Sequence, residues 1–155
     1  TSNKEMMIAD GGNIDSNLED AKQSLAYLQN TPGKFAICLK DSNQMIGFIS
    51  LLEIDDRAVT AYDLGYSIHP AHQRNGYAIE AIHRVLDFAF DEMNLKIVTA
   101  SHFIDNDVSR KILLNLGFVR EGLKRLSYYH PYYQKEMDMS VYSLLKNEYT
   151  QSKSK

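Results

Sequence analysis

The chain has 155 residues, of which 44% are hydrophobic and 24% are charged, and its formal net charge is −3. This length and composition predict one folded domain over residues 1–155 with a sizeable core. The slightly acidic balance disfavours nucleic acid as a partner. No apolar run of the sequence is long enough to span a bilayer, and no secretory signal is visible, so we expect a cytoplasmic protein without a membrane partner.

Cysteine and histidine usage limits the redox and metal chemistry. Cys38 is the only cysteine, so an internal disulfide is excluded. It lies in the apolar run Phe35 to Lys40, and we therefore expect a buried, unreactive thiol. The five histidines are dispersed without ligand spacing, so we expect no metal.

Local patterns predict alternating strands and helices. In chain order we expect a helix capped by Ser16 or Asn17 and running to about Leu28, strands at 35–40, 45–53 and 58–69, a helix at 78–93, a strand at 96–102, a helix from Asn106 or Asp107 to Leu116, and strands at 118–129 and 133–144. Turn residues at 41–44 indicate a hairpin between the first two strands. The helix at 78–93 is the clearest, because Ile79, Ile82 and Leu86 recur at helical spacing.

The order of these elements predicts the fold class. Strands in hairpins followed by a β-α-β-α-β run give an α+β domain with a mixed sheet. Gly117 is the expected left-handed stop of the helix that precedes it. We expect the last residues, 150–155, to form a flexible, solvated tail.

The loop from Gln73 to Ala78 is the most informative segment. It joins a predicted strand to the clearest helix, and a glycine loop that opens onto a helix presents unpaired N–H groups and the positive end of the helix dipole. We therefore predict a phosphate-bearing ligand. The sequence lacks a Walker A loop and the three glycines of a dinucleotide fingerprint. An ordinary strand-to-helix turn, with Gly76 at a tight backbone position, is the alternative.

Four segments together resemble the acetyl-CoA-binding core and the end of the GNAT N-acetyltransferases, in their order and spacing. They are the run Tyr62 to Pro70; Gln73, Gly76 and Ala78, which match the loop Q/R-x-x-G-x-G/A; Asn106 to Ser109 with Leu116-Gly117-Phe118, which resemble N-x-x-S … L-G-F; and Glu121-Gly122 with Asp138 and Tyr142 to Leu145, which resemble the RimJ/RimL-like branch. That branch acetylates protein N-termini. The resemblance covers roughly Phe35 to Tyr149.

The resemblance implies a fold, a co-substrate and a set of contacts. Two central parallel strands would splay apart and hold the pantetheine arm of acetyl-CoA, and the acetyl group would pass directly to a primary amine, either a protein N-terminal α-amine or a small-molecule amine. The implied cofactor-binding residues are Ile68, Gln73, Arg74, Asn75, Gly76, Tyr77, Ala78, Asn106 and Ser109. A solvated loop arginine remains the alternative for Arg74, and helix capping remains the alternative for Asn106 and Ser109.

Two residues are candidates for the proton transfers. Leu113 stands where many members of the family have a tyrosine, so Ser109 is the candidate to donate a proton to the leaving thiolate, with water as the alternative donor. Tyr128 is the nearest equivalent of the glutamate base of the RimL-like pattern. A tyrosine has a pKa of about 10 and is a poor base at neutral pH, so a water-mediated route and an already neutral amine stay open.

Two further clusters have open interpretations. The acids Glu53, Asp55, Asp56 and Asp63 could attract a cationic amine, or they could be a solvated turn. The four tyrosines around His130-Pro131 could line the acceptor pocket, bury a homodimer surface or serve ordinary sheet packing; they are Tyr128, Tyr129, Tyr132 and Tyr133.

The departures from the family pattern keep other functions open. RimJ/RimL-like chains usually begin with a strand and a helix that carry a basic segment, and this chain is expected to enter after them, near Ser2 to Met6. A CoA-binding module without catalysis is therefore the first alternative to an enzyme. A structural subunit that uses the tyrosines as an interface is the second.

Overall fold

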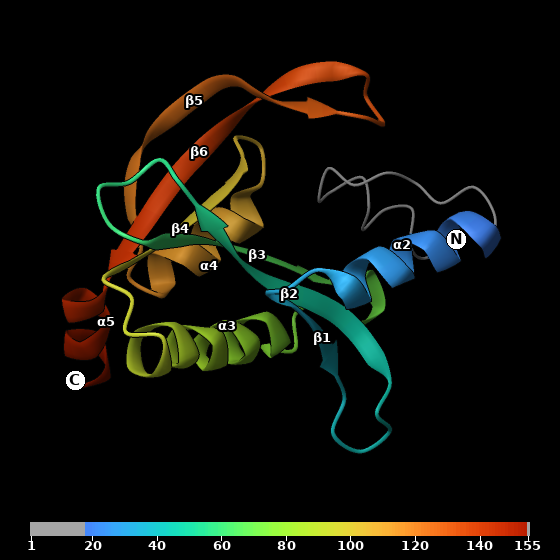
Figure 1. Ribbon diagram of the computed structural model, residues 1–155, viewed down its shortest axis with the longest axis horizontal. Helices are drawn as coiled ribbons and strands as arrows, with labels where there is room; N and C mark the ends of the chain where they lie inside the picture. Colours follow the sequence, from blue (N-terminus) through green and yellow to red (C-terminus); the bar gives the residue numbers. More distant parts are fainter. Residues whose placement is uncertain (1–17, 155) are drawn as a thin grey trace.

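The computed structural model describes residues 18–154 (Figure 1). Its elements in chain order are α2 (Leu18–Asn30), β1 (Lys34–Cys38), β2 (Met45–Ile54), β3 (Ala61–Ile68), the 3-10 turn η1 (Pro70–His72), α3 (Tyr77–Asp87), the π-helical turn η2 (Phe88–Glu92), β4 (Ile97–Phe103), α4 (Asp107–Asn115), β5 (Val119–His130), β6 (Lys135–Leu145) and α5 (Lys146–Lys153). The expected caps of the first helix, Ser16 and Asn17, lie outside the described residues. None of the helices within residues 18–154 has the length and apolar character needed to cross a bilayer.

All six strands form one sheet in the order β1-β2-β3-β4-β6-β5. Its neighbours are antiparallel except β3 and β4, which are parallel. This confirms the predicted α+β domain with a mixed sheet. The strand boundaries differ from the predicted ones by a few residues, as fraying ends usually do.

The parallel pair separates soon after it begins. Its ladder ends where Leu64 lies opposite Ala100, while β3 continues to Ile68 and β4 continues to Phe103. Each strand pairs on its other side over this stretch, with β2 and β6 respectively. The splay that the resemblance implied is therefore a feature of this sheet.

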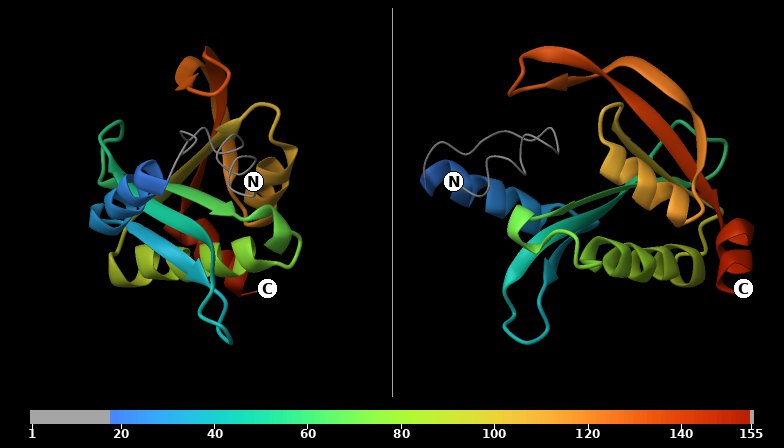
Figure 2. Two further views of the ribbon diagram at one scale, coloured as in Figure 1. Left: turned by 90° about the vertical axis from the view of Figure 1, so that its right-hand side faces the viewer. Right: turned by 180° about the vertical axis from the view of Figure 1, so that it is seen from behind.

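Helix α3 lies on one side of the sheet, and the outer part of the β5–β6 hairpin arches over the other side (Figures 1 and 2). On the α3 side, Ile82 and Leu86 are fully buried and belong to one core cluster with Leu64 of β3. Because strand side chains alternate between faces, Asp63 lies on the hairpin side. Ile79, predicted to belong to the apolar stripe of α3, is 37% exposed at the start of the helix.

The C-terminal end is helical as far as Lys153, so residues 150–153 of the predicted tail belong to a helix, and the side chains of residues 150–154 are exposed. Residues up to Lys153 form α5, in which Tyr149 is 2% exposed. The Tyr149 hydroxyl donates to an Asp87 carboxylate oxygen at 2.9 Å, and Lys153 pairs with the same carboxylate. The burial of one aromatic ring and these polar contacts therefore hold a segment whose composition alone reads as solvated.

Cys38 is exposed, which corrects the expectation of a buried thiol. It is the last residue of β1, the edge strand of the sheet. An apolar run indicates a strand, but it does not tell an edge strand from a central one. Gly117 has φ +88° after the C-terminal end of α4, which confirms the predicted left-handed stop of that helix.

Candidate active site

The loop before α3 has the geometry of an anion site. Gly76 is the N-cap of α3 with φ +82°, and the bond from the Glu80 N–H to the Gly76 carbonyl, 3.0 Å, opens the helix. The N–H groups of the first turn, beginning at Tyr77, therefore have no intrahelical acceptor. A Cβ added at Gly76 would meet nothing within 4 Å, so the space in front of this turn is open to a ligand.

Side chains of the loop brace its backbone. The Gln73 amide donates to the Ile68 carbonyl at 2.9 Å, and the Asn75 amide donates to the carbonyls of His72 and Gln73 at 3.1 and 3.0 Å. Arg74 is exposed in a left-handed conformation, φ +62°. Two of the three predicted polar side chains thus shape the loop, and backbone groups are left to bind the anion. Ala78, in the first turn of α3, is half-buried.

Asn106 and Ser109 come together at the start of α4. The Asn106 side chain accepts from the Ser109 N–H at 3.0 Å, which is the capping contact weighed as the alternative for this pair. Capping leaves the Ser109 hydroxyl available for another role. Leu113, where many family members have a tyrosine, is 1% exposed and packs in the core.

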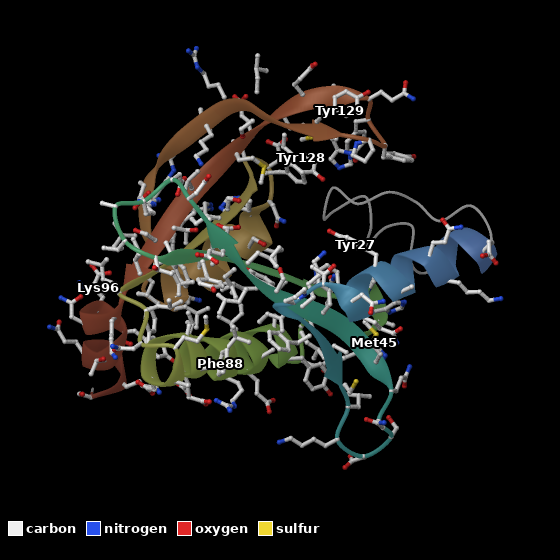
Figure 3. All side chains as sticks on the ribbon, viewed as in Figure 1. Tyr27, Met45, Phe88, Lys96, Tyr128 and Tyr129 are labelled. Carbon is white, nitrogen blue, oxygen red and sulfur yellow. The ribbon has the colours of Figure 1, made fainter. Side chains whose placement is uncertain are left out.

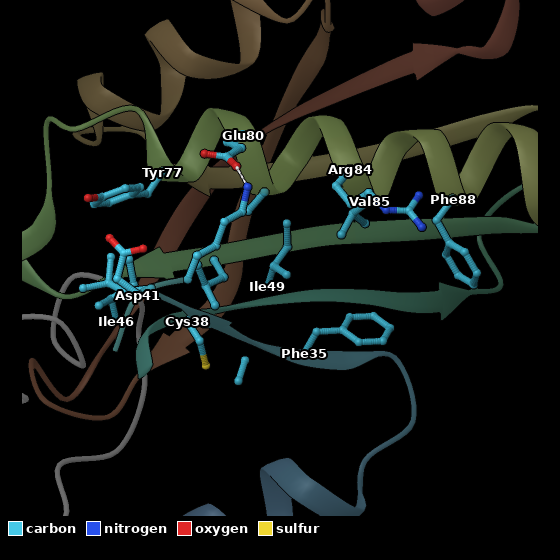
Figure 4. Close-up of a pocket in the computed structure, with 15 residues that line it drawn as sticks. Phe35, Cys38, Asp41, Ile46, Ile49, Tyr77, Glu80, Arg84, Val85 and Phe88 are labelled. Carbon is cyan, nitrogen blue, oxygen red and sulfur yellow. Dashed lines mark ion pairs between the residues drawn. The ribbon is translucent and has the colours of Figure 1, made fainter. Parts of the chain in front are cut away.

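A large apolar cavity lies between the edge strand and α3 (Figure 4). Its volume is about 710 Å³, and its lining includes Phe35, Ile49 and Val85. Lys40 and Glu80 form an ion pair of 3.6 Å across its rim. Its walls come from β1, β2, α3 and the adjoining turns, so it does not reach the splayed pair.

A smaller, polar cavity of about 260 Å³ lies on the hairpin side, where β3 and β4 run together. Its lining residues are Ile54, Asp56, Arg57, Asp63, Thr99, Ser101, Lys124, Ser127, Tyr128, Met139 and Val141. It therefore joins the β2–β3 loop, the parallel pair and the hairpin around one small space.

Asp63 and Thr99 form the polar wall of this small cavity. They lie opposite each other in the parallel ladder, and the Thr99 hydroxyl donates to the Asp63 carboxylate at 2.6 Å. Burial raises the pKa of Asp63, and the bond from Thr99 opposes part of that rise. Glu53, Asp55 and Asp56 are exposed, so the acidic cluster of the sequence divides into solvated turn residues and one half-buried carboxylate.

A bulge in the hairpin brings Tyr128 to the same cavity. Lys124 pairs with Met139 but Tyr128 pairs with Met137, so β5 contains extra residues at this point. Leu126 has φ +48° there, and its N–H donates to the Asp138 carboxylate at 2.8 Å. Bulges bend a strand and re-aim its side chains. Figure 3 shows Tyr128 beneath the hairpin, on the side that faces the sheet.

The surroundings of Tyr128 weaken its assignment as a base. Its ring meets Phe103 edge-on, 5.4 Å between ring centres, at the end of β4. Burial raises the pKa of its phenol above the ordinary value, which makes it a still poorer proton acceptor at neutral pH. The phenol is better suited to donating a hydrogen bond or to forming a wall of the cavity.

Two ion pairs involve residues that line the small cavity, Asp56, Arg57 and Lys124. The Arg57 guanidinium donates to both carboxylate oxygens of Glu121 at 2.9 and 2.6 Å, and Lys124 meets Asp56 at 3.2 Å. A second irregularity of β5, between Arg120 and Gly122, places Glu121 outside the regular ladder. The hydrogen bond from Arg57 lowers the pKa of Glu121, and the same bond raises the pKa of Arg57.

The structure brings the predicted residues into two groups and adds Thr99, which the sequence analysis did not select, beside Asp63, which it named only as one of four acids. The loop residues gather at the start of α3, and Asn106 meets Ser109 at the start of α4. Tyr128 lies instead with Asp63 and Thr99. A carboxylate within a run of strand-forming residues was the available signal for Asp63, because strands disfavour aspartate unless it has a specific role. Among the described residues, no three metal-ligating side chains lie together.

Comparison with known proteins identifies the family. The family described as acetyltransferase (GNAT) domain matches residues 1–119. The uncharacterized N-acetyltransferase YoaA of Bacillus subtilis (strain 168) is 31% identical over 141 residues, 84% of this chain and 76% of that protein. The uncharacterized N-acetyltransferase p20 of Bacillus licheniformis is 34% identical over 125 residues, 79% of this chain and 67% of that protein.

Solved structures agree on the fold. The ribosomal-protein-S5-alanine acetyltransferase from Vibrio fischeri has a TM-score of 0.76 and covers 96% of this chain and 84% of its own. At 24% identity, this likeness bears on the fold alone. The sequence match and the splayed sheet lead to one conclusion: the chain belongs to the GNAT acetyltransferase family.

Proposed function

We propose that this protein transfers the acetyl group of acetyl-CoA directly to a primary amine. The strongest support is the course of β3, which borders the gap between the parted strands and then leads into the anion site at the start of α3. It parts from β4 after Leu64, and through η1 it enters the loop whose Gly76 opens α3. An anion site and a gap between strands thus lie along one path, as a ligand with a pyrophosphate and a long arm requires.

Each part of the ligand has a counterpart in the chain. Backbone groups from Gln73 to Ala78 would hold the pyrophosphate, with Arg74 adding charge. The facing edges of β3 and β4 beyond Leu64 would pair with the amides of the arm in the manner of an added strand. The Ile68 carbonyl already accepts the Gln73 amide, so the arm would use other backbone groups at that end. A backbone N–H near the reacting carbonyl would polarise it.

The residues near the reacting end keep the roles we predicted for them, with one adjustment. Ser109 would donate a proton to the leaving thiolate, and Asn106 would hold it in place through the cap of α4. Tyr128 would form a wall of the acceptor cavity and donate a hydrogen bond there, since burial raises its pKa.

The relatives' names point to two acceptor classes. One relative, 30% identical over 105 residues, is the putative ribosomal N-acetyltransferase YdaF of Bacillus subtilis (strain 168), whose name is in keeping with the RimJ/RimL-like branch and a protein α-amine. A spermidine N(1)-acetyltransferase of Vibrio cholerae serotype O1 (strain ATCC 39315 / El Tor Inaba N16961) is 32% identical over 78 residues, half of this chain, and acts on a small amine. The proposed acceptor is therefore a primary amine, either a protein N-terminus or a small molecule.

A thermal-shift titration tests the donor first. We expect acetyl-CoA and desulfo-CoA, but not ATP, to raise the melting temperature, because a ligand of the folded state stabilises it by mass action. Thiol release with a panel of amines then tests catalysis. The release assay needs a Cys38→Ser background, since Cys38 is exposed and would react with the thiol reagent. Binding without release from any amine would favour a non-catalytic CoA-binding module, and no binding would refute the proposal.

A further inference from the structure

We propose that β1 is a dimerisation edge, which pairs in antiparallel fashion with β1 of a second copy of this chain about a twofold axis at Ala36. The pairing would join the two sheets into one. This inference goes beyond the proposed acetyl transfer and does not depend on it. It is drawn from the two edges of the sheet and from the cavity beside β1.

The two edge strands differ in how they are protected against the addition of another strand. β5 has two irregularities in its pairing, and the charged side chains of Arg120, Lys124 and Arg125 lie along it. Bulges and charged side chains are the devices by which edge strands avoid pairing with another chain. β1 has one irregularity, at its last residue, and no charged side chain between Lys34 and Cys38. Of the two edges, β1 is therefore the one suited to receive a strand.

Backbone groups of β1 are directed at this open edge. The Leu51 N–H donates to the Gly33 carbonyl at 2.7 Å, which makes these residues a bonded pair just before the β1–β2 ladder. Bonded pairs recur at every second residue of an antiparallel ladder, so the backbone groups of Phe35 and Ile37 bond β2. The N–H and carbonyl groups of Ala36 point the other way. Within residues 18–154, β1 pairs with no strand besides β2, so an added strand would supply their partners.

A second β1 fits this edge in a symmetric register. With Ala36 on the axis, its backbone groups bond those of the partner's Ala36, and Phe35 lies opposite the partner's Ile37. Phe35 is 45% exposed, and Ile37 is partly buried against the core beneath α3. Their position in the new ladder is a non-bonded one, which brings side chains closest, and pairs of an aromatic with a β-branched residue stabilise sheets. The small side chains at the axis leave room for this contact.

The cavity beside β1 would be shared by the two copies. Phe35 lies in its β1 wall (Figure 4). A twofold axis perpendicular to the sheet keeps α3 of both copies on the same side, so the two cavities of about 710 Å³ would adjoin. The charged residues of the lining are two cations and two anions, namely Lys40, Arg84, Asp41 and Glu80. Because neither sign is in excess, like-charge repulsion does not oppose the approach of an identical rim.

The contact is small, and its size sets the expected affinity. β1 has five residues, so the strand pair and the adjoining apolar lining fall at the low end of specific interfaces, below about 1,200 Å². We therefore expect a reversible dimer with a dissociation constant of about 1–100 μM. Both monomer and dimer would then be accessible to measurement.

Sedimentation equilibrium at concentrations below and above this dissociation constant tests the association. The Cys38→Ser protein is used, because the exposed thiol would otherwise link two chains by a disulfide. We expect its average mass to rise with concentration from one chain to two. A mass that stays at one chain throughout would overturn the inference.

A matched pair of substitutions at Ala36 tests the edge. Ala36→Pro removes the N–H that would bond the partner but no bond to β2, and proline is tolerated on edge strands in this orientation. It should stay monomeric at concentrations where the parent protein is a dimer. Ala36→Ser keeps the N–H and should dimerise like the parent protein. Equal melting temperatures of the three proteins at low concentration, where all are monomers, would show that Ala36→Pro folds.

An intermolecular disulfide tests the register. Lys34 would lie opposite the partner's Cys38 in a bonded pair, where the Cα atoms are about 5.5 Å apart and a disulfide fits. Within one chain the same two positions are four strand residues apart, about 13 Å, which is too far for a bridge. Lys34→Cys with the native Cys38 should therefore give a covalent dimer when treated with diamide. Lys22→Cys, which replaces an exposed lysine of α2, is the control and should give much less.

The outcomes separate this inference from the proposed function. A dimer that survives Ala36→Pro would place the interface elsewhere and overturn the pairing of β1. Lys34→Cys that crosslinks no better than Lys22→Cys would overturn the register at Ala36. Neither result touches the proposed acetyl transfer, whose failure would appear as the absence of acetyl-CoA binding and of thiol release.

Discussion

The two cavities lie on opposite sides of the sheet and differ in the charged side chains that line them. The larger one, between β1 and α3, has a mostly apolar lining, and three of its charged side chains are in ion pairs, Lys40 with Glu80 and Arg84 with Glu92. The smaller one, beside the parallel pair, contains the carboxylate of Asp63, which forms none of the ion pairs among residues 18–154, although Arg57 and Lys124 line the same cavity and act on it electrostatically. By volume alone, the larger cavity would be the candidate acceptor site. The half-buried carboxylate that could bind an amine lies in the smaller one.

The difference follows from the position of each cavity in the sheet. β1 is an edge strand, and its exposed residues Phe35 and Cys38 line the apolar cavity beside α3. β3 and β4 are central, and beyond Leu64 and Ala100 their facing edges no longer pair with each other. A separation of central strands costs ladder hydrogen bonds, so it indicates a functional site more strongly than an apolar hollow at an edge does.

The largest expected effect is at Gly76, whose loop follows β3, one of the two strands that part. Gly76→Ala and Gly76→Val should weaken acetyl-CoA binding progressively, reaching about a hundredfold for valine. That is the loss expected for two hydrogen bonds to a charged phosphate. Titration calorimetry would measure it.

Gly117→Ala is the matched control for Gly76→Ala. Both glycines have a left-handed backbone, φ +88° and +82°, and an added Cβ would meet open space at Gly76 and only an ordinary 3.8 Å contact with Leu144 at Gly117. Both changes should cost about 1–2 kcal/mol of stability from backbone strain. Equal CoA affinity in the two variants would contradict the assignment of the loop.

Ser109→Ala should lower kcat about tenfold while leaving acetyl-CoA affinity within about twofold. The effect is smaller than for a typical lost general acid because a thiol of pKa about 8.5 leaves readily as a thiolate. The variant keeps the Ser109 N–H that bonds the Asn106 side chain at 3.0 Å, so the cap of α4 is preserved. Steady-state kinetics with saturating amine would measure it, and an unchanged kcat would remove Ser109 from the proton path.

The ion pair of Arg57 and Glu121 joins a lining residue of the small cavity to β5. Glu121→Gln should lower the free energy of unfolding by about 1 kcal/mol at pH 7, as expected for a partly exposed bidentate pair. The pKa of Glu121 is lowered in the folded protein, so its stabilisation is present above the ordinary value of 4.5 and is lost as the pH falls through the folded pKa. Urea melts at pH 7 and pH 3 should therefore show a difference only at pH 7. Glu136→Gln, an exposed position on β6, should show none at either pH.

Asp63 should behave in the opposite way to Glu121. Its pKa is raised by burial, so between the unfolded value of 3.8 and the folded pKa the folded state binds more protons, and stability falls as the pH rises through that window. Asp63→Asn removes this loss. We expect it to be about 0.5–1 kcal/mol more stable than the parent protein at pH 7, the gain typical of a single stabilising change, and to match it near pH 3. A destabilised Asp63→Asn at pH 7 would show that the carboxylate serves folding and not acceptor binding.

The sequence predicts the features that local chemistry determines. The periodicity of Ile82 and Leu86 indicates α3, and Gly117 takes the left-handed conformation that its place after a helix requires. The strand-to-helix loop at Gly76 follows from the same local rules. These predictions hold because turns, caps and amphipathic stripes depend on neighbours in the sequence.

Predictions that depend on distant neighbours were less successful. Asp63 reads as part of an acidic turn until β3 is placed beside β4, where Thr99 meets it. The helix at the C-terminal end depends on Asp87 of α3, more than sixty residues earlier, which bonds Tyr149. Cys38 was expected to be buried because an apolar run does not reveal that its strand lies at the edge of the sheet.

The smallest expected effect is that of modifying Cys38, which ends the edge strand β1 and lines the large cavity. An exposed thiol should react with a maleimide in the folded protein, and the bulky adduct should fill part of the hollow beside α3. If the small cavity is the acceptor site, labelling should leave kcat/KM and the acetyl-CoA thermal shift within about twofold, as for a surface change away from the site. Cys38→Ser, which cannot be labelled, is the control. A labelled protein that binds acetyl-CoA normally but no longer acetylates an amine that the parent protein acetylates would place the acceptor in the large cavity and reverse the comparison.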